Sequence, residues 1–398
     1  MLNNISILHL LATTSAISWL ILFFFRGQFW RADQRLTNYA KSFIKLPEIV
    51  IIIPARNEET LLGASIGSLL GQTYAGLISI IIIDDNSDDS SPKIVQSWCD
   101  KNKNMQLING TTTPHGWTGK IWAMAQGVKL AKKRHPNAEY YLFTDADVLH
   151  HPDNLSDLIN KALNENLALV SLMVKLRCKS IWEIFLIPAY IFFFQKLYPF
   201  SWVNDPKNIT SAAAGGCMLV NCQELEKAGG FQVFRAAIID DCAMALIIKR
   251  SGPIWLGLTE STKSSRKYQF LHEITQMVCR TAFVQLKYSA INLLGTIIGM
   301  VIVYTVPLIC IIIALISKDI LLLILGFIGW IIMFVAYIPT LKLYTRPVWE
   351  AGLLPISALL YTVMTIMSAY QYRFGKKPSW KGRSLKKAEK NVPDKKTR

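Results

Sequence analysis

Four long apolar runs constrain this chain more than any other feature of its sequence. They contain no Lys, Arg, Asp or Glu, and they cover residues 5–25, 291–316, 320–341 and 351–372. A helix of about 20 apolar residues spans the hydrocarbon core of a bilayer, and each run is long enough to do so. The first run lacks the basic start and the small-residue cleavage site of a secretory signal. We therefore predict a membrane anchor at residues 1–27 and a second membrane region at residues 291–372.

Basic residues indicate which side of the membrane each part occupies. Arg26, Arg31 and Arg35 follow the first run, and the positive-inside rule then places the next segment in the cytoplasm. The tail at residues 373–398 has eleven Lys and Arg against two acids, so it carries +9 of the chain's formal net charge of +16. Beside apolar spans, such a tail is expected to contact anionic lipid head groups. The sequence shows no nucleic-acid-binding module, and we expect no nucleic-acid partner.

These charges leave the number of spans open. Four spans would put the basic tail outside the cell, against the positive-inside rule. One of the last apolar runs is therefore expected to be re-entrant or interfacial, and Pro355 makes the run at 351–372 the better candidate. The segments at about 181–200 and 270–290 are expected to lie on the membrane surface. For the first of them the alternative is an ordinary buried helix.

Residues 46–290, between the apolar regions, predict an α/β domain. Short buried runs at 49–53, 78–83 and 140–144 have the pattern of strands, and helical segments follow them. This alternation predicts parallel strands with helices on both faces of the sheet. In such a sheet, ligands bind at the carboxyl ends of the strands.

Three polar clusters come at these strand ends, at residues 54–58, 84–87 and 145–147. They are expected to converge at one edge of the sheet. Asp145 and Asp147 are spaced so that both carboxylates can face one hard cation. Ligation by few protein oxygens suits Mg²⁺ or Mn²⁺ held jointly with the phosphates of a substrate. The alternative is a polar loop in which Asp147 caps the helix that follows.

A donor with a pyrophosphate needs polar groups for its base and ribose, and cations for its leaving group. For each candidate cation the alternative is a solvated surface charge. Asn57 is expected to cap the helix after the first strand. The candidates for the base and ribose are Pro54, Ala55, Arg56, Glu58 and Asp85, and the candidate cations are Lys120, Arg266 and Arg280.

Asp240 and Asp241 form the best candidate for a general base. This acidic pair stands between apolar flanks and before a helix-like run. Adjacent carboxylates shift one another's pKa, and an apolar site raises the pKa of a base toward its working range. The alternative is a helix N-cap with a favourable acid in the first turn. The small residues at 211–217 would let the backbone approach a ligand closely, or would serve tight packing.

Together these segments resemble the inverting family-2 glycosyltransferases with a GT-A fold. The motifs that carry the resemblance are residues 51–58, 83–87, 144–147 and 239–241. More narrowly, the chain resembles the hopanoid-associated membrane glycosyltransferases of bacteria, which are relatives of ceramide glucosyltransferases. That resemblance rests on residues 116–120, 197–200, 212–219, 240–242 and 276–282.

The resemblance implies a cytoplasmic GT-A domain, Rossmann-like with a mixed sheet, and flanking transmembrane helices. It also implies a nucleotide-sugar donor, with Asp85 near the base, Asp145 at the ribose and phosphate, and Asp147 on the metal. Asp241, the second acid of the pair with Asp240, would be the general base.

One departure concerns the acceptor side. Related polymer synthases carry Gln-x-x-Arg-Trp, whereas here Gln276 stands four residues before Arg280 and Thr281 takes the place of the Trp. The role of Arg280 is therefore open, and long-chain synthesis is not expected.

The expected protein is a multi-pass enzyme of the bacterial inner membrane. It would transfer one sugar from a nucleotide donor to a lipid hydroxyl, and the resemblance points to a hopanoid or a similar polycyclic lipid. One alternative is a transferase acting on a polyprenyl phosphate, and another is a non-catalytic membrane scaffold with the same fold. The sequence does not identify the sugar, the nucleotide base or the lipid.

Overall fold

The computed structural model describes residues 2–36, 46–375, 379–380 and 383–384. The chain forms two compact units, and each is described by itself. Unit 1 comprises residues 1–37, 172–212 and 254–375, and unit 2 comprises residues 38–171, 213–253 and 376–398. Most of the predicted basic tail lies outside the described residues.

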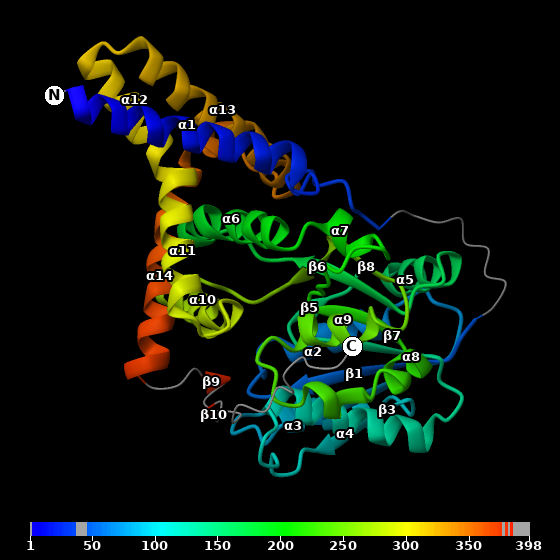
Figure 1. The fold of residues 1–398 in the computed structure, drawn as a ribbon. Helices are drawn as coiled ribbons and strands as arrows, with labels where there is room; N and C mark the ends of the chain where they lie inside the picture. The colour runs from blue at the N-terminus through cyan, green and yellow to red at the C-terminus, as the bar shows by residue number, and fades with distance from the viewer. Residues whose placement is uncertain (1, 37–45, 376–378, 381–382, 385–398) are drawn as a thin grey trace, which may run out of the picture. The chain divides into compact units, whose positions relative to one another are not determined.

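Unit 2 contains alternating strands and helices, as the sequence predicted (Figure 1). Its elements are β1 (Ile49–Ala55), α2 (Leu62–Leu70), β2 (Ile78–Asp84), α3 (Ser91–Cys99), β3 (Met105–Asn109), α4 (Gly119–Arg134), β4 (Tyr140–Thr144), β5 (Val148–Leu149), α5 (Asn154–Asn164), β7 (Cys217–Asn221), α8 (Cys222–Lys227), the 3₁₀ turn η1 (Gly230–Phe234), α9 (Asp240–Ile248) and the short strands β9 (Ser379–Trp380) and β10 (Arg383–Ser384). Strand β6 (Leu169–Lys175) begins in unit 2 and ends in unit 1.

The main strands of unit 2 belong to a mixed sheet, in which six consecutive strands have the order β3-β2-β1-β4-β7-β6. Strand β1 pairs in parallel with β2 and β4, whereas β7 runs antiparallel to both β4 and β6. All seven residues of β1 are buried, as expected for a central strand covered on both faces. Helix α4 packs tightly on this sheet, because a Cβ on Gly127 would lie 2.7 Å from Ile52 and 2.8 Å from Ile83.

One prediction of a helix start was wrong, and one of the alternatives is contradicted. Helix α2 begins at Leu62, and Asn57 does not cap it. Asn57 instead lies in a loop with φ of 51°, and its side-chain oxygen accepts a hydrogen bond from the Asp88 N–H at 2.9 Å. Asp147 does not cap a helix either, because β5 follows it directly and Asp153 occupies the N-cap position of α5.

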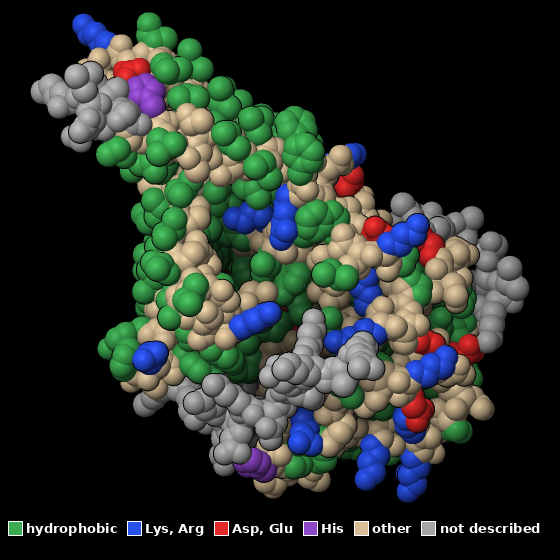
Figure 2. Space-filling model, in the orientation of Figure 1, with side chains coloured by type: hydrophobic (Ala, Val, Ile, Leu, Met, Phe, Trp, Pro, Cys, Tyr) green, Lys and Arg blue, Asp and Glu red, His purple; other side chains and the backbone are tan. Residues whose placement is uncertain are grey.

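Unit 1 is mostly helical. Its elements are α1 (Leu2–Phe25), α6 (Ile181–Leu197), α7 (Phe200–Asn204), β8 (Ile254–Ser264), α10 (Leu271–Gln285), α11 (Ala290–Met300), the π-helical turn η2 (Val301–Thr305), α12 (Val306–Ser317), α13 (Ile320–Leu343), the 3₁₀ turn η3 (Val348–Leu353) and α14 (Leu354–Phe374). In the described part of the chain, four helical segments are long and apolar enough to cross a membrane, namely Ile7–Phe25, Ala290–Ser317, Ile320–Leu343 and Val348–Phe374. Figure 2 shows apolar side chains gathered over these helices.

The helices of unit 1 pack in two groups. Helix α1 lies beside α12 and α13, and α14 runs beside α11 and α10 (Figure 1). Trp19 of α1 is fully buried, and its indole N–H donates to the Val303 carbonyl at 2.6 Å. This bond joins α1 to η2.

Candidate active site

The register of the sheet brings the predicted polar segments to one edge of unit 2. Ala55 pairs with Asp84 in the parallel ladder, so β1 and β2 end together. Strand β4 ends at Thr144, which lies opposite Cys217 at the start of the antiparallel strand β7. The loops after β1, β2 and β4 and the small residues before β7 therefore meet at the same edge. Figure 1 labels β1, β7 and α9 in this unit.

Asp145 and Asp147 lie in the tight turn between β4 and β5. The turn is closed by the Val148 N–H, which donates to the Asp145 carbonyl at 3.2 Å. The Asp145 side chain is 37% exposed and pairs with Lys120, whereas Asp147 is only 6% exposed. Among the described residues, no group of three or more His, Cys, Asp or Glu could hold a metal ion. A cation at this turn would therefore need ligands from a substrate as well.

Lys120 connects the turn to the predicted base. It lies in the first turn of α4, and its Nζ is 2.9 Å from Asp145 Oδ1 and 3.4 Å from Asp240 Oδ2. Burial alone would lower the pKa of Lys120, but the carboxylates of Asp145 and Asp240 outweigh it and raise that pKa. The structure thus places Lys120 as a charged bridge between two acidic segments, and not as a solvated surface charge.

Asp240 and Asp241 lie in the first turn of α9, and Ile239 occupies the N-cap position. Asp241 Oδ2 accepts a hydrogen bond from the Gly215 N–H at 2.8 Å, and Oδ1 accepts one from the Cys242 N–H at 2.7 Å. Burial and the Asp240 carboxylate raise the pKa of Asp241 to about 6, against the opposite effect of Lys120. Its carboxylate is therefore both fixed in direction and more basic than an ordinary Asp.

The small residues before β7 allow this arrangement. A Cβ on Gly215 would lie 3.3 Å from both Asp241 Oδ2 and Lys120 Nζ, so a side chain at this position would crowd both groups. The Ser171 hydroxyl holds the preceding residue, since it accepts from the Ala214 N–H at 2.9 Å and donates to the Ala214 carbonyl at 3.1 Å. The Gly215 N–H and Ser171 were not predicted, because a backbone donor and a buried serine carry no sequence signal.

The loops after β1 and β2 are braced by Arg56. Its guanidinium donates to the carbonyls of Asp85 and Asn86, both at 2.5 Å, and its Nη2 lies 3.3 Å from Asp88 Oδ2. Asp85 is fully buried, and Glu58 is 6% exposed with its N–H bonded to Ser91 Oγ at 2.8 Å. Pro54 and Ala55 are buried at the end of β1. The predicted contacts of these residues with a donor stay predictions.

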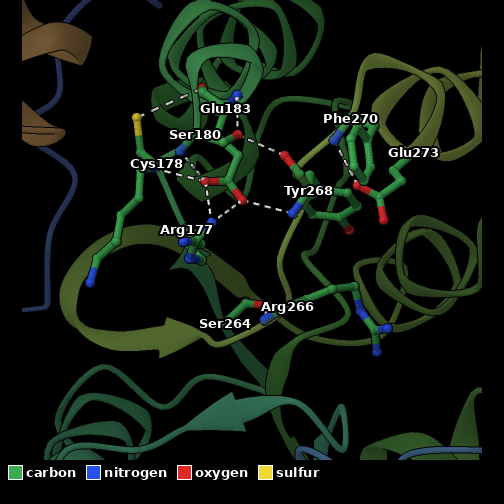
Figure 3. Close-up of polar contacts among 10 residues, drawn as sticks. Arg177, Cys178, Ser180, Glu183, Ser264, Arg266, Tyr268, Phe270 and Glu273 are labelled. Carbon is green, nitrogen blue, oxygen red and sulfur yellow. Dashed lines mark hydrogen bonds and ion pairs between the residues drawn. The ribbon is translucent and has the colours of Figure 1, made fainter.

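Arg266 and Arg280 belong to unit 1. Arg266 follows β8, and Figure 3 shows its side chain extending away from the polar cluster around Glu183. Arg280 lies on α10. The other predicted site residues all belong to unit 2, and a role for either arginine at that site stays a prediction.

Comparison with known proteins supports the predicted class. Residues 50–228 match the model of the family described as "Glycosyl transferase family 2". An uncharacterised glycosyltransferase of Haemophilus influenzae is 33% identical over 126 residues, which are 32% of this chain and 46% of the relative. The 4,4'-diaponeurosporenoate glycosyltransferase of Staphylococcus aureus is 27% identical over 199 residues, which are 49% of this chain and 50% of the relative. The chain thus spans about half the length of the curated relatives it matches.

One solved structure resembles the chain over most of its length. It is the mannosyltransferase PcManGT from Pyrobaculum calidifontis in complex with GDP-Man and Mn²⁺, with a TM-score of 0.53 and 15% identity, covering 90% of this chain and 99% of the other. This likeness and the mixed sheet confirm the predicted Rossmann-like GT-A fold. The family match shows that residues 50–228 are similar to the family-2 glycosyltransferases, which supports the predicted enzyme class.

Proposed function

We propose that this protein transfers a single sugar from a nucleotide-sugar donor to the hydroxyl group of a membrane lipid, with inversion at the anomeric carbon. The observation that carries the proposal is the Asp241 carboxylate. It is held by two backbone N–H groups, and Lys120 reaches from its neighbour Asp240 to Asp145. A hopanoid or a similar polycyclic lipid is the proposed acceptor, and this choice rests on the sequence resemblance alone.

The chemistry follows from the placement of these groups. The acceptor hydroxyl oxygen forms a bond to the anomeric carbon while the bond from that carbon to the diphosphate oxygen breaks. Asp241 accepts the hydroxyl proton, because its raised pKa suits a general base near neutral pH. Attack opposite the leaving group inverts the configuration. Lys120 lies where its charge can stabilise the departing nucleoside diphosphate.

A divalent cation fits the turn between β4 and β5. Asp145 and Asp147 offer the hard carboxylate oxygens that Mg²⁺ and Mn²⁺ prefer, and the donor's phosphates would complete the ligand set. Such an ion would neutralise charge on the leaving diphosphate. The Mn²⁺ and GDP-Man named for PcManGT support a metal and a nucleotide-sugar donor for this chain as well. Asp85 at the end of β2 is the proposed contact to the nucleotide base.

The proposed function predicts a lipid product that depends on Asp147. Membranes containing the protein are incubated with a panel of nucleotide sugars and extracted lipids, and products are identified by mass spectrometry. We expect one glycolipid with the wild type and a loss of roughly a hundredfold or more with Asp147→Ala, because the phosphates lose a metal ligand. EDTA should have the same effect, and Mn²⁺ should reverse it.

The control is Asp205→Ala, since Asp205 is an exposed acid of unit 1. Identical products from the wild type and Asp147→Ala would overturn the proposed mechanism. A wild-type protein that binds no nucleotide sugar in calorimetry, with or without Mn²⁺, would favour the scaffold alternative.

We further propose that the protein crosses the inner membrane three times, with unit 2 and the basic tail in the cytoplasm. The spans are α1, the continuous segment α11–α12, and α13. His9 Nε2 lies 3.3 Å from Asp319 Oδ2, so α1 meets the turn between α12 and α13 near its own start. This contact supports placing the start of α1 and that turn together on the non-cytoplasmic side of the membrane.

Helix α14 is the segment that does not span in this proposal. Its first half is bonded to α6, where the Tyr361 hydroxyl donates to the Leu186 carbonyl at 2.8 Å. Its second half is bonded to α10, where the Ser368 hydroxyl donates to the Cys279 carbonyl at 2.6 Å. Because α6 and α10 are the segments expected at the membrane surface, α14 lies there with them. The tail then stays inside, as the positive-inside rule requires.

Reporter fusions test this topology. Green fluorescent protein fused after Arg398 should fluoresce, and alkaline phosphatase fused there should be inactive, because the tail is cytoplasmic. A phosphatase fused after Lys318, in a chain truncated there, should be active. An active phosphatase after Arg398 would contradict the proposal and make α14 a fourth span.

A further inference from the structure

A chain of buried hydrogen bonds lies directly behind the turn that carries Asp145 and Asp147. The Asn154 side-chain Nδ2 lies 3.0 Å from His150 Nδ1, and His150 Nε2 lies 2.9 Å from Thr144 Oγ1. The Thr144 hydroxyl donates to the Gly216 carbonyl at 2.8 Å. Thr144, His150 and Asn154 are 1%, 5% and 3% exposed, so these contacts cannot be replaced by solvent.

The direction of every bond in this chain is determined by the number of protons available. The single hydroxyl proton of Thr144 goes to the Gly216 carbonyl, so Thr144 Oγ1 accepts from His150. His150 must then carry its proton on Nε2, and its Nδ1 accepts from the Asn154 amide. Burial lowers the pKa of His150 to about 4, so the ring is neutral, as this pattern requires.

The chain ends at the backbone that holds the proposed base. The Gly216 carbonyl accepts from the Thr144 hydroxyl and also from the Asp145 N–H, at 3.4 Å. The adjacent Gly215 N–H donates to Asp241 Oδ2 at 2.8 Å. A shift of residues 215–216 would therefore change the position of Asp241 relative to the Asp145–Asp147 turn. None of the hydrogen bonds described above joins the His150 side chain to the carboxylates of Asp145, Asp147 or Asp241.

We propose that His150 is a positioning residue that sets the distance between the proposed base and the donor-binding turn. It does so by donating to Thr144 and thereby holding the Gly216 carbonyl. This inference rests on the proposed function, because it assigns the two ends of the chain to acceptor activation and donor binding. It assigns no contact with substrate to His150.

Three variants separate positioning from a general loss of folding. His150→Phe keeps a ring of similar size and removes both nitrogens. His150→Gln keeps an N–H donor that can reach Thr144, and Thr144→Val removes the hydroxyl while keeping the shape. The matched control is His151→Gln, because His151 is the neighbouring histidine and its side chain is 50% exposed.

The expected signature is a split between kcat and KM. His150→Phe should lower kcat by about 10- to 100-fold, since a small misplacement of reacting groups has effects of this size. The KM for the nucleotide sugar should change less than threefold. Thr144→Val should lower kcat to a similar extent. The kcat of the double variant that combines it with His150→Phe should be no lower than that of the slower single variant, because both substitutions break the same series of hydrogen bonds. His150→Gln should recover most of the lost kcat.

The result that would overturn the inference is a lower unfolding temperature for His150→Phe with an unchanged kcat per folded molecule. A lack of recovery in His150→Gln, together with additive single variants, would overturn it as well. If the wild type transfers no sugar and binds no nucleotide, the proposed function fails separately. Positioning is then decided by NMR with ¹⁵N-labelled His and Gly. A neutral Nε2–H ring in the wild type and shifted Gly215 and Gly216 amides in His150→Phe support it, and unshifted amides refute it.

Discussion

Replacing Asp241 by Asn should slow transfer to a hydroxyl lipid by about 10²- to 10⁴-fold while nucleotide-sugar binding persists. Asparagine has the same shape, and its carbonyl oxygen can still accept from the Gly215 N–H, which donates to Asp241 at 2.8 Å. It cannot accept the proton of the acceptor. General base catalysis contributes about 10²- to 10⁴-fold, so we expect kcat to fall within that range. Single-turnover assays with isolated membranes would measure the fall, and calorimetry would measure donor binding.

The pH profile gives this prediction a second readout. Because the raised pKa of Asp241 is about 6, kcat/KM of the wild type should increase as the pH rises through about 6 and then level off. The residual activity of Asp241→Asn should lack that step. If Asp241→Asn retains full activity, the acceptor is already anionic, as in the polyprenyl-phosphate alternative, and the role of Asp241 as a base is refuted.

The same raised pKa predicts that Asp241 lowers stability at neutral pH. Between about pH 4 and pH 6 the folded state holds a proton that the unfolded state has already released, because the unfolded pKa is about 3.9. The free energy of unfolding therefore falls as the pH rises through this window. The raised pKa stems from burial and the Asp240 carboxylate. Asp241→Asn should thus be more stable than the wild type at neutral pH, by on the order of 3 kcal/mol.

Thermal unfolding in detergent at several pH values checks this effect. The difference between Asp241→Asn and the wild type should grow from pH 4 to pH 6 and then stay constant. Asp205→Asn is the control, because Asp205 is exposed and keeps its local bond to the Lys207 N–H as an asparagine. A variant that is both inactive and less stable at neutral pH would mean that Asp241 is structural.

The edge of the sheet could be predicted from the sequence because buried apolar runs show where each strand stops. Asp85 comes directly after β2, and Asp145 comes directly after β4. Strands β2 and β4 both pair in parallel with β1, so their ends lie at the same edge of the sheet on either side of it, and local patterns were enough to bring them together. The place of β7 was not predictable in this way, because its pairing with β4 depends on chain segments far apart in the sequence.

The contacts within the site were less accessible to sequence reasoning. Lys120 joins Asp145 to Asp240 across three distant segments, and no local pattern encodes that choice. Asn57 has the local pattern of a cap, yet its bond to Asp88 belongs to a loop–loop contact. Thr144, His150 and Asn154 have no distinctive pattern in the sequence. Only their burial in the structure shows that their polar groups must be hydrogen-bonded.

Replacing Glu183 by Ala should strongly destabilise unit 1. The Glu183 side chain has no exposed surface, and Figure 3 shows its carboxylate among converging donors. Arg177 Nη1 donates to both oxygens, at 2.8 and 2.6 Å. The N–H groups of Lys179, Ser180 and Tyr268 donate at 2.8, 2.9 and 2.7 Å. One carboxylate therefore joins the start of α6 to the segment between β8 and α10.

The expected loss of stability arises from the hydrogen-bond donors that would lose the Glu183 carboxylate. Without the carboxylate, the Arg177 guanidinium loses its anion and three backbone N–H groups lose their acceptor in a buried place. Breaking a buried pair in this way costs about 3–5 kcal/mol. Burial alone would raise the pKa of Glu183, but the hydrogen bonds from Ser180, Tyr268, Lys179 and Arg177 hold it below its usual value. The ionised Glu183 carboxylate therefore stabilises the folded state fully at pH values above its pKa in the unfolded chain. This contribution is lost as the pH falls through its lower pKa in the folded protein.

Chemical unfolding of the purified protein in detergent measures this loss. Glu183→Ala should unfold at a much lower denaturant concentration than the wild type, and Glu183→Gln should fall between them because it keeps a side-chain oxygen but no charge. The matched control is Glu273→Gln, since Glu273 is partly exposed and accepts from a single backbone N–H, that of Phe270 at 2.9 Å. Lowering the pH should reduce the difference between the wild type and Glu183→Gln, because protonation removes the charge that the variant lacks. If Glu183→Gln and Glu273→Gln lower the free energy of unfolding equally, Glu183 acts only as a helix cap.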